Sequence, residues 1–147
     1  MKKIVAIALA AAFTVVAGTA MAADTADLDV TATVISSCSM TGGTLAFGNL
    51  DPTNAVEVTA SSTAVTVTCT NGTAYTLSGD DGDHAVAGQK YLDNGTSTIP
   101  YSVSIPAGGT GTGAAVGVTI DGTIAANSYN TATAGTYTDT ILLSVNP

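Results

Sequence analysis

The chain has 147 residues, with eleven acidic side chains against three basic ones. Two of the basic residues, Lys2 and Lys3, lie at the extreme N-terminus, and Lys90 is the third. Because nucleic acids and anionic lipid surfaces are bound through clusters of Lys and Arg, this composition excludes both as partners.

The first 22 residues have the three parts of a secretion signal. Lys2 and Lys3 precede an apolar run from Ile4 to Val16, and small residues follow as far as Ala22. The apolar run is too short to span a bilayer. We therefore expect cleavage before Ala23 and export of a mature chain that does not insert into a membrane.

A strictly alternating segment, Asp27 to Val34, follows the signal. In an extended strand, alternation places its apolar residues on one face and its Asp and Thr residues on the other. The apolar residues are Leu28, Val30, Ala32 and Val34. The segment predicts a strand, and the pattern leaves open whether its sheet belongs to its own domain or to a neighbouring molecule.

Two cysteines, Cys38 and Cys69, occur in this exported chain. Exported proteins commonly pair their cysteines, so we expect one structural disulfide. A metal site would need further ligands, and a redox pair would more often have the spacing C-x-x-C.

The rest of the sequence is rich in Thr, Val, Ala and Gly and poor in residues that favour helices. Short alternating segments separated by Asn-Gly, Asp-Gly and Gly-Gly pairs predict strands joined by turns, and hence an all-β two-sheet sandwich. Gly108–Gly113 is predicted to be a flexible loop, and Gly108-Gly109 and Asp121-Gly122 to be turns. The predicted strands are 44–48, 55–59, 64–70, 74–78, 99–105, 116–124 and 137–145.

Few residues offer chemistry for an enzyme. His84 is the single histidine, and it follows the acidic loop Asp80–Asp83. We interpret both as a solvated loop, because the loop lacks the spacing of a calcium site and a catalytic triad would need a serine and an aspartate to converge on His84. A weak cation site remains the alternative, and we expect no catalytic residue, no metal and no cofactor.

Several short motifs occur in an order that matches a known family. They are Ser37-Cys38-Ser39, Leu45-Ala46-Phe47-Gly48, Val65 to Thr70, Tyr91 to Gly95 leading to Ile99-Pro100-Tyr101, and Gly135 to Thr140 before Ile141 to Val145. In this order the sequence resembles the spore coat protein U domain family, and within it the major subunits of archaic chaperone-usher pili.

The resemblance implies an incomplete immunoglobulin-like sandwich that lacks its last strand and is completed by donor-strand complementation. It implies a signal peptide (1–22), a donor extension (23–34) and a pilin domain (35–147). The donor side chains would be Leu28, Val30, Ala32 and Val34, and Ala32 would fit its pocket least well or shift the register by two. The acceptor groove would use Ile141, Leu143 and Val145, and Cys38 and Cys69 match the family's disulfide.

The same resemblance implies partners and a location. Identical subunits would join head to tail after contact with a periplasmic chaperone and an outer-membrane usher, and a tip subunit would end the fibre. The fibre would lie on the cell surface and support adhesion and biofilm formation. Two alternatives remain open: a spore or cell-surface coat protein of the same fold, and a secreted carbohydrate-binding adhesin module.

Overall fold

The computed structural model describes residues 23–147, and the expected signal peptide (1–22) lies outside the described residues. The chain divides into two units, one that ends at Thr33 and a domain from Val34 to Pro147. In the first unit, residues 23–33 are exposed and contain no strand. The alternating segment is therefore not a strand here, since a strand requires a hydrogen-bonded partner and no described residue supplies one.

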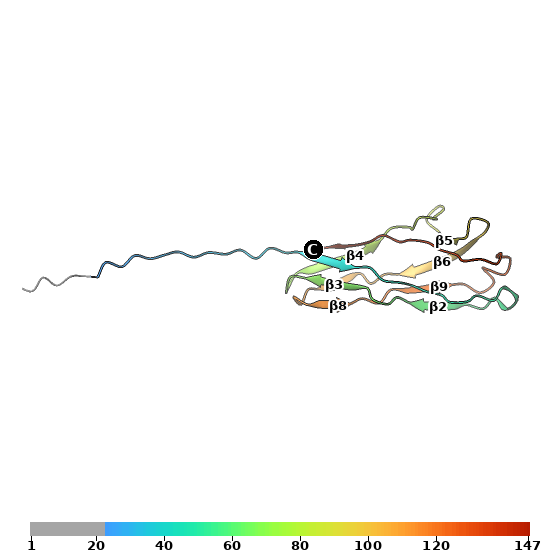
Figure 1. Cartoon of the computed structure of the whole chain (residues 1–147), viewed down its shortest axis with the longest axis horizontal. Coiled ribbons are helices and arrows are strands. Elements are labelled where there is room, and N and C mark those ends of the chain that lie inside the picture. The colour runs from blue at the N-terminus through green and yellow to red at the C-terminus, as the bar shows by residue number, and fades with distance from the viewer. Residues whose placement is uncertain (1–22) are drawn as a thin grey trace, which may run out of the picture. The chain divides into compact units, whose positions relative to one another are not determined.

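The domain is built from short antiparallel strands, which confirms the predicted all-β class (Figure 1). Its only described helix is a single 3₁₀ turn, η1 (Pro52–Asn54), capped by the Asp51 side chain. The strands are β1 (Cys38–Thr41), β2 (Val58–Ser61), β3 (Thr66–Cys69), β4 (Ala74–Gly79), β5 (Lys90–Asp93), β6 (Thr98–Ser104), β7 (Gly108–Thr110), β8 (Ala115–Gly117), β9 (Asp121–Ile124) and β10 (Leu143–Asn146).

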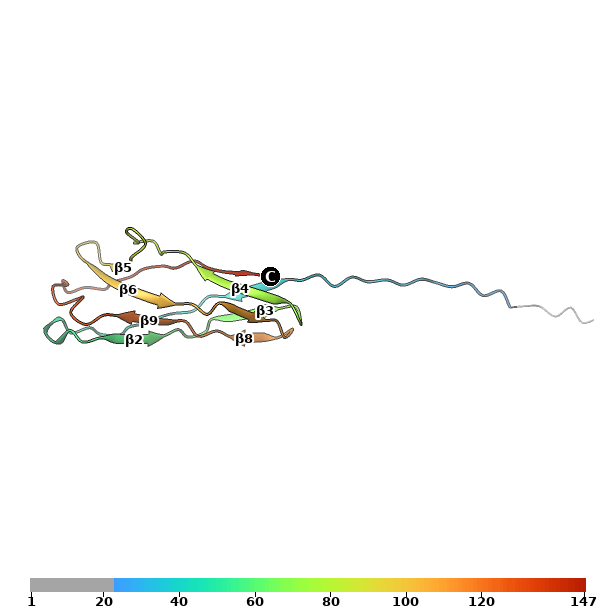
Figure 2. The same ribbon diagram turned by 180° about the vertical axis from the view of Figure 1, so that it is seen from behind.

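Three sheets share the strands, in the orders β1-β3-β8, β2-β9-β6-β5 and β10-β4-β7. β2, β9 and β6 lie side by side in Figure 2. The chain passes directly from β2 to β3, from β6 to β7 and from β8 to β9, so the three sheets continue into one another. We call this continuous series of paired strands the pairing path. It begins with β1 at one edge and ends with β10 at the other.

A β-bulge connects the first two sheets. Ser61 pairs with Asp121 and Thr66 pairs with Gly117, so one strand has an additional residue between the two pairs. Ala64 lies in this bulge with a φ of 64°. Bulges bend a strand and increase its twist, so this one turns the β1 end of the path away from the β6 end.

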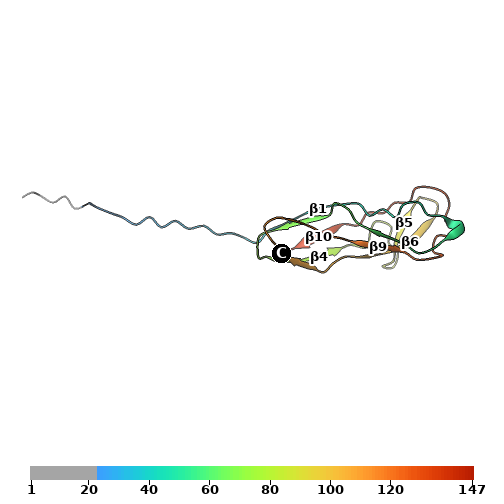
Figure 3. The same ribbon diagram turned by 90° about the horizontal axis from the view of Figure 1, so that it is seen from below.

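The two edge strands of the path meet. β1 pairs only with β3 and β10 only with β4 among the described residues, and β1 and β10 contact each other (Figure 3). The pairing path therefore curls until its edges face each other without hydrogen bonding.

The core lies inside this curl. The Tyr101 and Phe47 rings pack edge to face, with centroids 6.1 Å apart, and the Tyr129 hydroxyl donates to the Val56 carbonyl at 3.0 Å. The buried apolar residues are Val65, Val67, Cys69, Ile99, Tyr101, Ile120, Ile124 and Tyr129.

Two glycine pairs do not have their predicted roles. Gly108 and Gly109 belong to strand β7 rather than to a flexible loop or turn, and Gly108 pairs with Thr76. A Cβ at Gly108 would lie 2.1 Å from the Tyr75 carbonyl oxygen, so glycine permits this close approach of two strands. Gly122 likewise lies within β9 rather than in a turn.

The boundaries of several predicted strands were also wrong. Segment 44–48 forms only an isolated bridge at Thr44. In the predicted strand 137–145, Thr138 forms an isolated bridge with Asp93, and β10 begins only at Leu143. β2 begins only at Val58, and β5 was not predicted as a strand. Alternation shows which residues face inward, but pairing decides where a strand begins and ends.

Candidate subunit interface

A groove runs along the domain between two segments that are far apart in the sequence. It consists of two adjoining cavities of about 350 Å³ and about 830 Å³, which share Leu45, Phe47 and Leu92 in their linings. We call 43–47 the N-terminal wall and 137–143 the C-terminal wall, because both segments line these cavities.

The N-terminal wall is held close to the neighbouring strand. Thr44 and Thr63 exchange backbone hydrogen bonds of 3.2 and 2.9 Å. A Cβ at Gly43 would lie 2.0 Å from the Thr63 carbonyl oxygen, so only glycine fits there without displacing backbone. Farther along, a Cβ at Gly122 would lie 2.6 Å from the Leu45 side chain and 2.8 Å from the Phe47 ring, so glycine leaves room for both side chains.

The C-terminal wall uses only one of its two hydrogen-bonding edges. The backbone of Thr138 pairs with Asp93, and the carbonyls of Thr140 and Leu142 accept from Asp83 and Asp80. Backbone groups of successive residues in a strand point to opposite edges. The N–H and C=O groups of residues 139, 141 and 143 therefore point to the edge with which no described strand forms hydrogen bonds.

The side chains of the same odd-numbered residues point into the groove. Asp139, Ile141 and Leu143 line the smaller cavity, whereas Leu142 is 69% exposed on the outer face. Tyr137 lines the larger cavity. This part of the domain thus offers apolar pockets and unpaired backbone groups together, which is what an added strand binds.

Of the three residues predicted for the acceptor groove, Ile141 and Leu143 line the cavities, but Val145 does not. Val145 lies in β10 opposite Leu77. Both cavities end before this part of β10, which contacts β1.

A polar cluster lies within the C-terminal wall. The Tyr101 hydroxyl donates to Asp139 Oδ2 at 2.5 Å, and His84 Nδ1 lies 3.1 Å from Asp139 Oδ1. The Asp139 side chain is only 1% exposed. Burial opposes its ionisation, but the hydrogen bonds from Tyr101 and His84 outweigh burial and hold the pKa of Asp139 below its ordinary value. Burial, followed by the neighbouring carboxylate, raises the pKa of Tyr101.

His84 lies in an exposed turn, in line with the interpretation of this segment as a solvated loop. Its ring and its backbone N–H also contact Asp139, which the sequence did not indicate. Among the described hydrogen bonds, no serine joins this pair.

The acidic loop is anchored to the C-terminal wall as well. Asp80 Oδ1 accepts from the backbone N–H groups of Gly82 and Leu142, at 3.0 and 2.9 Å. Lys90 Nζ donates to the Asp80 carbonyl at 2.6 Å. Within residues 23–147, no group of three His, Cys, Asp or Glu side chains is placed to hold a metal ion.

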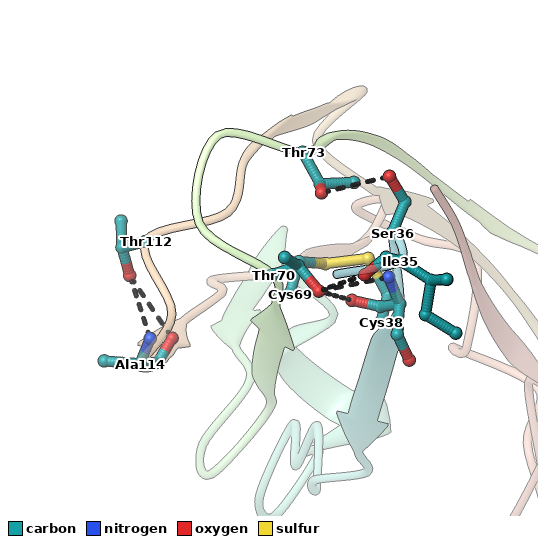
Figure 4. The surroundings of a disulfide bond; sticks show 9 residues. Ile35, Ser36, Cys38, Cys69, Thr70, Thr73, Thr112 and Ala114 are labelled. Carbon is teal, nitrogen blue, oxygen red and sulfur yellow. Dashed lines mark hydrogen bonds between the residues drawn. A yellow bond between two sulfur atoms is a disulfide. The ribbon is translucent and has the colours of Figure 1, made fainter. Parts of the chain in front are cut away.

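Figure 4 shows the surroundings of the disulfide between Cys38 and Cys69, which joins β1 to β3. Thr70 Oγ1 donates to the Ile35 carbonyl at 3.1 Å, and the Thr70 N–H donates to the Ser37 carbonyl at 2.9 Å. These bonds fix the start of the domain at the end where β1 begins.

The N-terminal segment carries large exposed apolar side chains. Leu28 and Val30 are 85% and 82% exposed, and Val34, the first residue of the domain, is 84% exposed. Ile35 is 73% exposed as well, and all residues from 23 to 37 are exposed. Large apolar side chains exposed together are typical of a surface that binds another molecule.

Fold and groove together define an antiparallel all-β domain with an open edge beside its C-terminal strand. The sequence profile of the Spore Coat Protein U domain family matches residues 24–104. This match covers more than half of the chain, so the chain belongs to the Spore Coat Protein U domain family.

One solved structure that the comparison matches is the pre-assembly complex of the chaperone CsuC with the tip adhesion subunit CsuE, from archaic chaperone-usher Csu pili of Acinetobacter baumannii. The TM-score is 0.48 and the sequence identity 22%, over 77% of this chain and 40% of that chain. The present chain thus spans less than half the length of the protein it matches. No curated protein sequence matches it. No helix within residues 23–147 is long and apolar enough to cross a membrane.

Proposed function

We propose that this chain is a structural subunit of a cell-surface pilus of the chaperone-usher type. In this proposal, residues 27–34 of one subunit enter the groove of the next and complete its sheet. The observation that carries the proposal is the C-terminal wall, which presents inward apolar side chains and an uncovered backbone edge over the same residues.

The length of the donated segment suits the groove. Eight residues in a strand span about 26 Å, and the seven residues of the C-terminal wall span about 23 Å at about 3.3 Å per residue. The aliphatic side chains of Leu28, Val30 and Val34, which are exposed to water here, would become buried in the cavities. Each would contribute about 1.5–3 kcal/mol when fully buried.

The topology favours an open fibre. Cys38, the first residue of β1, pairs with Cys69 at the end of β3. A short turn joins β3 to β4, where Thr76 pairs with Asn146, the last residue of β10. β1 therefore begins at the end of the domain where β10 finishes. A donor antiparallel to β10 would finish beside Tyr137, at the opposite end. The β1 end of each subunit would then meet the far end of the next, and this head-to-tail contact repeats without closing.

A parallel donor would instead bring two β1 ends together and close a pair of subunits. Every strand pair in the described domain is antiparallel, and the antiparallel ladder is the more stable of the two. The antiparallel donor is therefore the arrangement we adopt.

The remaining parts of the proposal concern partners. An open apolar groove with a free edge promotes aggregation, so a periplasmic chaperone would cover it before assembly. An outer-membrane usher would then exchange the chaperone for the extension of the incoming subunit, and a tip subunit would end the fibre. Export by the signal peptide (1–22), adhesion and biofilm formation belong to the same proposal.

The test compares two substitutions in the extension. Val30→Asp places a charge on the inward face, and Thr31→Asp places the same charge on the outward face one residue away. We expect Val30→Asp to abolish fibres seen by electron microscopy, while the subunit still accumulates in the periplasm. Thr31→Asp should leave fibres intact. Normal fibres from Val30→Asp would refute strand donation.

The family's name supports a second candidate, a coat protein of the same fold. Immunogold labelling of intact cells separates the two functions. Label along thin fibres supports a pilus subunit, and an even layer of label over the cell or spore surface supports a coat.

A further inference from the structure

The polar cluster around Asp139 makes the C-terminal wall uneven along its length. From one end to the other, the inward side chains are Tyr137, Asp139, Ile141 and Leu143. Three of these offer apolar surface, whereas Asp139 holds a carboxylate bound to Tyr101 and His84. A side chain inserted opposite Asp139 meets a carboxylate, and one inserted opposite its neighbours meets an apolar pocket.

The donor segment is uneven in the same way. Its inward face carries Leu28, Val30, Ala32 and Val34, so one small residue interrupts three larger ones. The Asp139 side chain is only 1% exposed, and its carboxylate is held by Tyr101 and His84. A large apolar side chain opposite Asp139 would crowd this hydrogen-bonded position, whereas alanine needs the least room.

We propose that Asp139 sets the register of strand donation by accepting Ala32 and no larger residue opposite it. This inference rests on the proposed function. In this register Val30 lies against Ile141, Leu28 against Leu143, and Val34 against Tyr137. The two aliphatic donors enter the cavity of about 350 Å³, and Val34 enters the cavity of about 830 Å³.

Shifting the donor by two residues in either direction makes a poorer fit. One shift places Val30 opposite Asp139 and leaves Ala32 in the larger cavity. The other places Val34 opposite Asp139 and Leu28 beside Val145, which lines neither cavity. Each of these shifts brings a valine against the carboxylate and leaves a pocket underfilled.

The outward face gives a direct measure of the register. The Thr140 carbonyl accepts from Asp83, so the Thr140 backbone faces away from the donor. A donor residue beside Thr140 would therefore form a non-hydrogen-bonded pair, with Cα atoms about 4.5 Å apart, which suits a disulfide. In the proposed register that residue is Thr31, and in the shifted registers it is Asp29 or Thr33.

The experiment uses three double variants of the full chain, each carrying Thr140→Cys on the outward face. The second substitution is Thr31→Cys, Asp29→Cys or Thr33→Cys. Fibres are purified, oxidised and run on non-reducing denaturing gels, and free monomer is run as the control. We expect a ladder of covalent multimers from the Thr31 variant, at least severalfold stronger than from the other two.

Stronger cross-linking from the Asp29 or Thr33 variant would overturn the register, and so would fibres that cross-link in none of the three. Failure of the proposed function is a different result, in which the unsubstituted chain forms no fibres. Ala32→Leu and Val30→Leu add a second measurement. We expect Ala32→Leu to reduce fibre yield severalfold and Val30→Leu to retain it, and the opposite order would also contradict the role of Asp139.

Discussion

Gly43 determines how closely the N-terminal wall approaches β3. A Cβ at this position would lie 2.0 Å from the Thr63 carbonyl oxygen and 2.6 Å from a Val65 methyl group. The adjacent Gly42 has open space around it, with nothing within 4 Å of such a Cβ. The structure has room for a side chain at Gly42 but not at Gly43. The sequence alone does not show this difference.

This difference gives a matched pair of substitutions. We expect Gly43→Ala to lower the free energy of unfolding by about 1–3 kcal/mol, because backbone must move to relieve the overlap. Gly42→Ala should change it by less than about 0.5 kcal/mol, as is usual for an open surface site. Urea unfolding of the mature chain, followed by circular dichroism, measures both. Equal effects would contradict the crowding at Gly43.

Among the structural elements, β1 depends most on a covalent tie. It has four residues and pairs with β3 along one edge only, and its first residue, Cys38, is bonded to Cys69. A strand this short has few hydrogen bonds with which to stay paired. We therefore assign the disulfide the role of keeping β1, and the N-terminal wall that follows it, in position.

Replacing both cysteines by serine tests this role. The two cysteines are 31 residues apart, and the chain-entropy model gives a loss of about 3–4 kcal/mol for a loop of that size. Urea unfolding of the mature double variant, beside the unreduced parent, gives the value. A loss below about 1 kcal/mol would show that β1 stays paired without the bond.

In the whole molecule, Asp139 connects parts that are distant in the sequence. Its carboxylate binds Tyr101 in β6 and His84 after the acidic loop, and Lys90 anchors that loop from β5. The pKa of Asp139 is lower in the folded domain than its ordinary value of 3.8. A lowered pKa stabilises the fold at pH values above the ordinary pKa, and this stability disappears as the pH falls through the lowered value.

The acid dependence can be measured with Asp139→Asn. We expect the parent to be more stable than this variant at about pH 5 and the difference to shrink towards about pH 2, where the carboxylate is protonated. Urea unfolding of both mature chains at several pH values follows the difference, and Asp24→Asn in the exposed extension is the matched control. A difference that does not change with pH would show that the ionised form of Asp139 has no special role.

Much of the fold could be predicted from the sequence. Alternation at 64–70, 74–78 and 99–105 corresponds to β3, β4 and β6, because a half-buried strand requires an apolar residue at every second position. The pairing of Cys38 with Cys69 could be inferred because the chain has only two cysteines. The resemblance to the family implied Ile141 and Leu143 as groove residues, and both line the smaller cavity.

Other features were decided by tertiary structure alone. Gly108 and Gly109 lie in a strand because β4 approaches their backbone. Val145 pairs with Leu77 and lies outside both cavities. The contact of His84 with Asp139 joins residues 55 positions apart. Thus the sequence by itself determined the class of fold, the disulfide and the apolar faces, since these depend on local periodicity and composition. Only the tertiary structure decided which edge stays uncovered and which polar side chains lie beside it, because both depend on contacts between distant segments.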